Sequence, residues 1–234
     1  MLSKKINATC VRSIQSIKRL LRPPLHRIES VVPLRVLGTD YGGWPVIEDS
    51  LSSESCVYSF GVGQDISFDL ALIAEYGCKV AAFDPTPRSM TWVESQNTPE
   101  LFQFYPVGLS DANQVLSFYA PIQEDFVSYS VSKRTDNQER VELPVKPLDE
   151  IMSDLDDTKI DFLKMDIEGS EYPAIADMIN KQIFPAQLCV EFHHGMFGHT
   201  KDQTRDAVSA LKNVGYRIHY VSSGGREYGF HRPA

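Results

Sequence analysis

The sequence predicts an α/β domain built on a doubly wound, mostly parallel sheet. Short β-rich runs alternate with helical stretches from residue 56 onward, which is typical of strand–helix–strand units with right-handed crossovers. Two of the runs, residues 161–165 and 188–192, have the apolar character of buried parallel strands. A glycine-rich turn after the first run is the third observation that favours this fold class.

The elements follow in order along the chain. Gly77 is placed to end the first helix, and Pro173 is tolerated because it lies in the first turn of a helix. The last two strands are read as a hairpin that adds one antiparallel strand at the sheet edge. Strands are expected at residues 56–60, 79–83, 104–108, 115–120, 140–145, 161–165, 188–192, 216–221 and 227–231, and helices at 67–76, 89–96, 171–181 and 201–213.

Composition is that of an ordinary globular protein, with 42% hydrophobic and 23% charged residues. The net charge of -8 is uneven, because residues 1–30 carry seven basic side chains and one acid. The remaining chain is therefore strongly acidic and would repel phosphate backbones, which argues against a nucleic-acid substrate.

Two regions are expected: a basic extension over residues 1–36 and the main domain over residues 37–234. Residues 1–22 have the apolar spacing of an amphipathic helix, which Pro23 and Pro24 end. Packing of this helix on its own domain or on a dimer partner is the preferred interpretation, and contact with an anionic membrane surface is the alternative. Four well-separated cysteines and the lack of a spanning apolar run favour a cytoplasmic protein.

The first chemical signal is a glycine turn followed by an acid at the end of the next strand. Gly61 and Gly63 allow close backbone approach to a ligand, and Asp84 is placed to accept hydrogen bonds from ribose hydroxyls. A dinucleotide is disfavoured, because Ile66 replaces the third glycine of its fingerprint and Asp65 would oppose a pyrophosphate. A cationic sulfonium ligand suits such an acidic site better.

With these residues in place, the chain resembles the FkbM-type family of methyltransferases that depend on S-adenosylmethionine (SAM). The likeness runs from about residue 37 to residue 221. The block Lys-Met-Asp-Ile-Glu-Gly-Ser-Glu at residues 164–171 is its most specific part, and the other blocks lie at residues 37–44, 59–69, 83–87, 107–111 and 190–194.

The resemblance implies a Rossmann-like class I methyltransferase fold with seven strands, the last antiparallel, and O-methylation with SAM as donor. It implies that Gly61 and Gly63 line the methionine part of SAM and that Asp84 binds the ribose. Ser59 stands where the family usually has an acid, which leaves the methionine ammonium to Asp65 or Asp166. The further implied cofactor contacts are Ser110 and Asp111 near adenine, Asp166 beneath the sulfonium, a covering segment of Tyr41, Gly43 and Trp44, and the neighbouring Phe60, Ser67, Pro85 and Thr86.

Topology alone predicts where the chemistry lies, since ligands of open α/β sheets bind beyond the carboxyl ends of the strands. Asp166 follows one strand there, while Glu191, His193 and His194 end the next. We expect His193 to act as general base toward the acceptor hydroxyl, with His194 and Asp166 as reserves and Glu191 as a further catalytic candidate.

Structural roles compete with these assignments. Asp166 and Glu191 could pair with Lys164, and Glu168 and Glu171 could simply favour a helix dipole. The carboxylates and His193 also offer the mixed ligands of a divalent ion, but no fixed ligand spacing supports a metal, so the sequence assigns none.

The leading functional hypothesis is O-methylation of a hydroxyl on a sugar, glycolipid or secondary metabolite. An NAD-linked oxidoreductase and a non-catalytic SAM-binding module are the alternatives. The aromatic and polar stretch at residues 118–129 is a guess for the acceptor pocket, made from its position alone.

Overall fold

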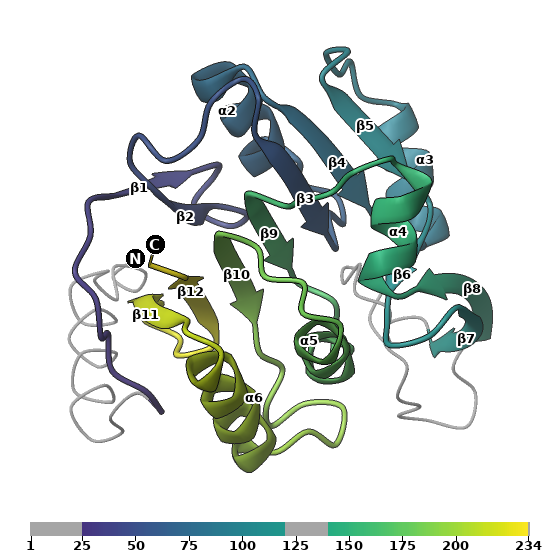
Figure 1. The fold of residues 1–234 in the computed structure, drawn as a ribbon. Helices are drawn as coiled ribbons and strands as arrows, with labels where there is room; N and C mark the ends of the chain where they lie inside the picture. The colour runs from purple at the N-terminus through teal and green to yellow at the C-terminus, as the bar shows by residue number, and fades with distance from the viewer. Residues whose placement is uncertain (1–24, 120–139, 234) are drawn as a thin grey trace, which may run out of the picture.

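The computed structural model describes residues 25–119 and 140–233 (Figure 1). The helix expected at residues 1–22, and most of the stretch considered for the acceptor pocket, lie outside the described residues. Among the described helices, none combines the length and apolar character needed to cross a membrane.

A seven-stranded sheet in the order β11-β12-β10-β9-β3-β4-β5 forms the centre of the domain. The five central and right-hand strands pair in parallel, while β12 is antiparallel to both of its neighbours. The predicted Rossmann-like α/β fold is confirmed. The strands are β3 (Cys56–Phe60), β4 (Lys79–Phe83), β5 (Phe102–Tyr105), β9 (Phe162–Met165), β10 (Gln187–Glu191), β11 (Arg217–Val221) and β12 (Glu227–His231).

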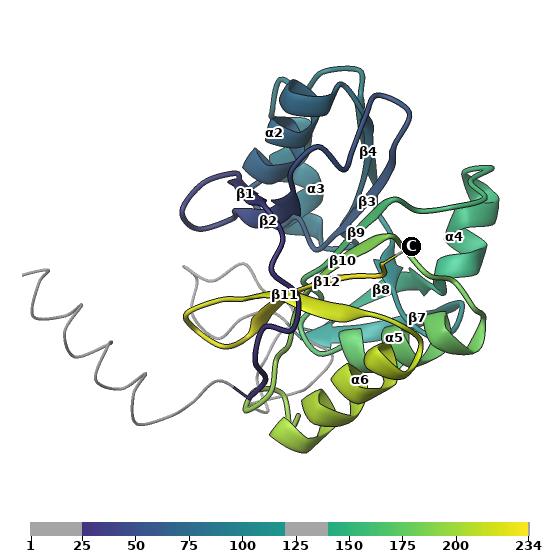
Figure 2. The ribbon, with the colours of Figure 1, turned by 60° about the vertical axis from the view of Figure 1, so that its left-hand side comes forward.

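Helices cover both faces of this sheet (Figure 2). The first helix ends where Gly77 adopts a left-handed conformation with φ of 67°. The last begins with a capping box between Thr200 and Gln203. One face carries α2 (Ser67–Tyr76) and α3 (Pro87–Glu94), and the other carries α4 (Leu148–Asp154), α5 (Glu171–Asn180) and α6 (Lys201–Asn213).

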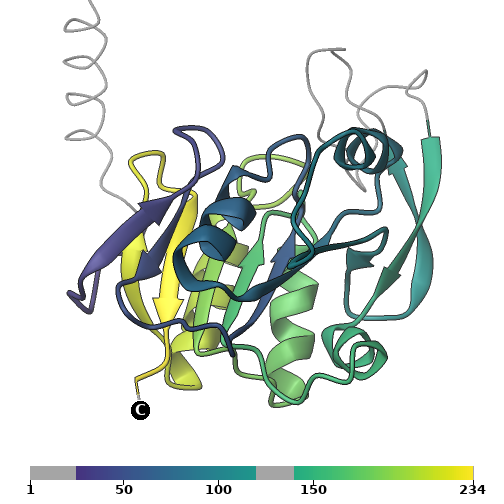
Figure 3. The same cartoon turned by 90° about the horizontal axis from the view of Figure 1, so that it is seen from above.

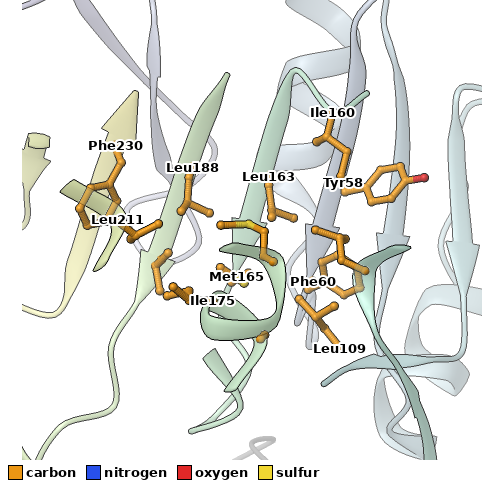
Figure 4. Packing of buried hydrophobic residues seen from close by; sticks show 14 of the residues in the cluster. Tyr58, Phe60, Leu109, Ile160, Leu163, Met165, Ile175, Leu188, Leu211 and Phe230 are labelled. Atoms are coloured by element: carbon orange, nitrogen blue, oxygen red, sulfur yellow. The ribbon is translucent and has the colours of Figure 1, made fainter. Parts of the chain in front are cut away.

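Alternation along the strands divides the core into two apolar layers. Tyr58 and Phe60 of β3 pack toward α5 and α6, together with Leu163 and Leu188 (Figure 4). Val57, which precedes Tyr58 and lies on the opposite face, packs toward α2. The sheet is therefore buried on both faces, as its apolar strands predict.

Two expectations about strands are corrected. The terminal hairpin does not add its antiparallel strand at the edge, because β12 inserts between β10 and β11 and leaves β11 outermost. The strand expected at residues 104–108 is two strands, because Pro106 has no N–H to donate and separates β5 from the short β6 (Gly108–Leu109).

Two smaller sheets flank the main one. A hairpin of β1 (Leu34–Leu37) and β2 (Trp44–Ile47) lies near one end, and a three-stranded sheet lies at the other (Figure 3). The second consists of β6, β7 (Gln114–Tyr119) and β8 (Arg140–Lys146), so these predicted strands exist but belong outside the main sheet.

A buried histidine lies in the hairpin that closes the main sheet. His219 on β11 is only 2% exposed, and its Nδ1 lies 3.3 Å from Nδ1 of His231 on β12. Its Nε2 is buried without a hydrogen-bond partner among the described residues. Burial, with the neighbouring His231 charge, lowers the pKa of His219 to about 4.

This lowered pKa predicts loss of stability in weak acid. As the pH falls, His219 binds a proton in the unfolded chain before it does so in the folded protein. The free energy of unfolding is therefore unaffected by this group above about pH 6.5 and decreases as the pH falls toward 4. The wild type should therefore lose about 2 kcal/mol more unfolding free energy between pH 7.5 and 4.5 than His219→Leu does. Urea denaturation of both proteins measures this, and equal losses in the two would contradict it.

Candidate functional site

The carboxyl ends of three neighbouring strands meet at one edge of the main sheet. Strand register places Phe60 beside both Phe83 and Met165, so the residues that follow, Gly61, Asp84 and Asp166, come together there. The order of strands changes direction between β3 and β9, which is the place where open α/β sheets bind ligands.

Gly61 makes the closest backbone approach at this edge. It adopts a φ of +77°, and a Cβ on it would lie 1.7 Å from the Asp166 carbonyl oxygen. Its N–H donates to the Phe83 carbonyl at 2.8 Å, and the Asp166 N–H donates to the Phe60 carbonyl at 3.1 Å. Only glycine fits here, both sterically and by conformation.

Asp84 is held in one orientation by its own loop. It is 5% exposed, and its Oδ1 accepts from the Thr86 N–H at 2.9 Å and from the Thr86 hydroxyl at 2.6 Å. Its Oδ2 accepts from the Gly63 N–H at 3.0 Å. The glycine turn and the predicted ribose-binding acid therefore form one connected unit.

The residues predicted to lie near adenine flank this unit. Pro85 packs against Gly108, where a Cβ would lie 3.1 Å from the proline Cγ. Two residues further on, Ser110 is buried and its hydroxyl donates to Asp111 at 3.1 Å. The structure therefore brings the loop after β6 next to the loop that carries Asp84.

The turn between β1 and β2 is joined to the glycine loop. The Thr39 hydroxyl donates to Asp65 Oδ2 at 2.7 Å, and the Thr39 N–H donates to the Ser67 hydroxyl at 2.9 Å. Asp65 Oδ1 accepts from the Ser67 N–H at 2.8 Å. Both carboxylate oxygens of Asp65 thus bond the protein itself, as do those of Asp84, so Asp65 and Asp166 both stay candidates for the cofactor ammonium.

The predicted covering residues lie on the same turn and the strand after it. Tyr41 is 86% exposed. Gly43 closes the turn, where a Cβ would lie 2.5 Å from the Thr39 carbonyl oxygen, and Trp44 is buried at the start of β2.

Lys164 supports the glycine turn from within the sheet. This lysine is 5% exposed, and its ammonium donates to the carbonyl of Gly61 at 2.8 Å and to that of Phe60 at 3.3 Å. It also lies 5.5 Å from the ring centroid of Trp44, within the range of a cation–π contact. The pairing with Asp166 or Glu191 considered from the sequence is replaced by these contacts.

His193 stands at the centre of a group of carboxylates. Its Nδ1 lies 3.3 Å from Glu171 Oε1. Its Nε2 lies 3.4 Å from Glu168 Oε2, 3.7 Å from Asp166 Oδ1 and 4.0 Å from Glu191 Oε1. We call Asp166, Glu168, Glu191 and His193 the carboxylate–histidine cluster.

Electrostatics in this cluster oppose the expected role of His193 as general base. Burial disfavours its protonated form, but the hydrogen bond and charge of Glu171, with Glu168 and Asp166, outweigh burial and raise the pKa of His193 to about 9. The imidazole therefore already holds a proton at neutral pH. Burial and repulsion from Asp166 raise the pKa of Glu191 to about 7.

His194, the reserve candidate for the base, faces another element. Its Nδ1 lies 3.2 Å from the Thr204 hydroxyl on α6, which also bonds the Tyr172 hydroxyl at 3.0 Å. Burial and the charge of Arg226 lower the pKa of His194. The structure thus groups Asp166, Glu191 and His193, and directs the His194 ring away from them.

Sequence reasoning missed what three residues do here. The sequence leaves Glu171 open between a helix-dipole role and a functional one, and does not reveal that it is fully buried and accepts from the N–H groups of His193 and Gly169, both at 2.8 Å. Lys164 could have been noticed as a charge inside an apolar strand. Thr39 carries no signal in the sequence, because its partner Asp65 is 26 residues away.

Comparison with known proteins agrees with this geometry. The model of the methyltransferase FkbM domain family matches residues 48–218, most of the chain. No curated protein gives a significant match.

Similar solved structures include methyltransferase FkbM from Methylobacillus flagellatus KT, at 15% identity and a TM-score of 0.47, with 77% of this chain covered. This chain spans 44% of that protein. The methyltransferase domain of bacterial CtHen1-C is similar at 13% identity and a TM-score of 0.37, with 77% of this chain and 90% of that chain covered. The family match over residues 48–218 shows that this chain belongs to the FkbM methyltransferase family.

Proposed function

We propose that the chain transfers the methyl group of SAM to a hydroxyl oxygen of a small molecule or glycan, such as a sugar, glycolipid or secondary metabolite. The observation that carries this proposal is the junction of Gly61 with Asp166. This junction brings the glycine loop and Asp84, which would bind the ribose, next to the carboxylate–histidine cluster.

The residues at this edge fit SAM in chemistry. Asp84 is a buried carboxylate oriented by Thr86 and Gly63, as a ribose-binding acid must be. Asp166 supplies negative charge for a cationic sulfonium or ammonium group. When bound, SAM supplies an electrophilic methyl group, which leaves its electron pair on sulfur as the acceptor oxygen gives up its proton.

The protein's part is to orient the acceptor and to favour loss of that proton. The carboxylate–histidine cluster lies where this is needed, beyond β9 and β10. Tyr41, exposed on the β1–β2 turn, would cover the site once the cofactor is bound. A hydroxyl-bearing small molecule or glycan is the substrate class that we propose, and the acidic charge balance disfavours nucleic acid.

An NAD-linked oxidoreductase is less well supported. Ile66 is buried in the apolar layer beneath α2, where the third glycine of a dinucleotide fingerprint would lie. The carboxylates at the strand ends would also repel a pyrophosphate. Binding of NADH without binding of S-adenosylhomocysteine would overturn the proposed function.

Asp84→Ala tests the cofactor site. The variant should bind S-adenosylhomocysteine at least about tenfold more weakly, a loss of about 1.4 kcal/mol, because the ribose loses its acceptor. Calorimetric titration measures the affinity. Asp202→Ala is the matched control, since Asp202 is an exposed carboxylate on α6. Equal affinities in wild type and Asp84→Ala, with the protein folded, would contradict the assignment.

Thr39→Val tests the attachment of the covering turn. The substitution keeps the side-chain shape but removes the hydroxyl that donates to Asp65 and accepts from the Gly42 N–H. We expect a loss of about 1 kcal/mol, or about fivefold weaker binding of S-adenosylhomocysteine, with an unchanged circular dichroism spectrum. Thr158→Val, at an exposed threonine before β9, is the control. Unchanged affinity in Thr39→Val would show that the turn does not cover the cofactor.

A further inference from the structure

Three residues at the ends of two adjacent strands present metal-ligating atoms to one point. Asp166 follows β9, while Glu191 ends β10 and His193 lies two residues beyond it. One ligand atom from each lies within 4.8 Å of the other two. Their neighbourhood follows from the parallel register of the two strands, which pairs Val190 with Met165.

The spacing of these atoms suits ligands that share a cation. Nε2 of His193 lies 3.7 Å from Asp166 Oδ1 and 4.0 Å from Glu191 Oε1, which is longer than a hydrogen bond. Two ligand atoms that are each about 2.1 Å from one ion lie about 3.0 Å apart at a right angle and about 4.2 Å apart when opposite. The observed separations fall between these limits.

His193 is fixed in the orientation that a ligand needs. The fully buried carboxylate of Glu171 lies 3.3 Å from its Nδ1 and also accepts from the His193 backbone N–H at 2.8 Å. A proton on Nδ1 directed at Glu171 leaves the lone pair of Nε2 facing Asp166, Glu191 and Glu168, whose Oε2 is 3.4 Å away. In metal sites the imidazole that binds the ion commonly donates its other N–H to a carboxylate in this way. His193 is itself buried, at 2% exposure.

The three side chains differ in how far they are exposed to solvent. The His193 side chain is 3% exposed, whereas those of Asp166 and Glu191 are 31% and 23% exposed. A cation held between them would be anchored from the protein side and open toward solvent. Two carboxylates and one imidazole, with open positions, favour Mg²⁺ or Mn²⁺ over cations that prefer sulfur or several imidazoles.

We propose that Asp166, Glu191 and His193 bind one divalent cation of the Mg²⁺ or Mn²⁺ type. Its role rests on the proposed function: the open positions would hold the acceptor hydroxyl and increase its acidity, as metals do for water. The hydroxyl proton would pass to water on the exposed side, and the oxygen would form its bond to the methyl group as the bond between that methyl and the sulfur of SAM breaks, with the electron pair staying on sulfur.

Binding of Mn²⁺ alone tests the site without any acceptor. Chelator-treated protein is titrated with Mn²⁺, and free Mn²⁺ is followed by electron paramagnetic resonance. We expect one saturable site per chain, displaced by Mg²⁺, whose affinity falls by at least about tenfold in Glu191→Gln and in Asp166→Asn. Both substitutions keep side-chain shape and relieve like-charge repulsion, so they should fold; circular dichroism checks this. Asp202→Asn is the control that should bind like wild type.

Parallel calorimetry with S-adenosylhomocysteine separates this proposal from the proposed function. No saturable Mn²⁺ binding, or equal binding in wild type and both variants, would overturn the cation site even if S-adenosylhomocysteine binds. Mn²⁺ binding that depends on Glu191 and Asp166, together with S-adenosylhomocysteine binding, supports both. The same Mn²⁺ result without S-adenosylhomocysteine binding supports the cation site and overturns its role in methyl transfer.

Discussion

The contact between the Gly61 backbone and the Asp166 carbonyl is the constraint on which the site depends. A side chain at Gly61 would meet that oxygen at 1.7 Å, so the turn after β3 and the end of β9 form one tightly packed junction. Lys164 holds the same turn by donating to the carbonyls of Phe60 and Gly61. The glycine loop and the carboxylate–histidine cluster are therefore packed against each other, which would hold the two parts of the proposed reaction at a fixed spacing.

Charge is arranged differently on the two sides of this junction. On the side of α2, burial raises the pKa of Asp69 to about 6, and the positive charge of the buried Lys164 opposes this shift. Beyond it, the three carboxylates of the cluster face a single imidazole. The Lys164 ammonium donates its hydrogen bonds to backbone carbonyls and forms no ion pair with the carboxylates of the cluster among the described residues. The excess negative charge is thus left at the point where a cationic cofactor and a divalent ion are proposed to bind.

Local patterns were sufficient to predict the parts of the fold that depend on short segments. Alternating strands and helices, and acids placed directly after strands, predict that Asp84 and Asp166 share one edge, because parallel strands end together. The hairpin pattern at residues 216–231 predicts that β11 and β12 pair, but it does not determine which of them also pairs with β10. Contacts between distant segments were equally invisible: Thr39 with Asp65, and Glu171 with His193. These depend on tertiary packing, which no short window of sequence contains.

The surroundings of His193 bear on how the acceptor loses its proton. Nδ1 is directed at Glu171, and Nε2 faces Asp166, Glu168 and Glu191. If the cluster holds no cation, these carboxylates keep the imidazole protonated. If it holds one, the Nε2 lone pair is engaged with the ion. In neither state is a nitrogen of His193 available to take a proton from the acceptor. If the proposed methyl transfer takes place here, it is therefore better explained by an acceptor hydroxyl made more acidic where it binds than by a histidine base, and Glu171 would then serve to orient His193.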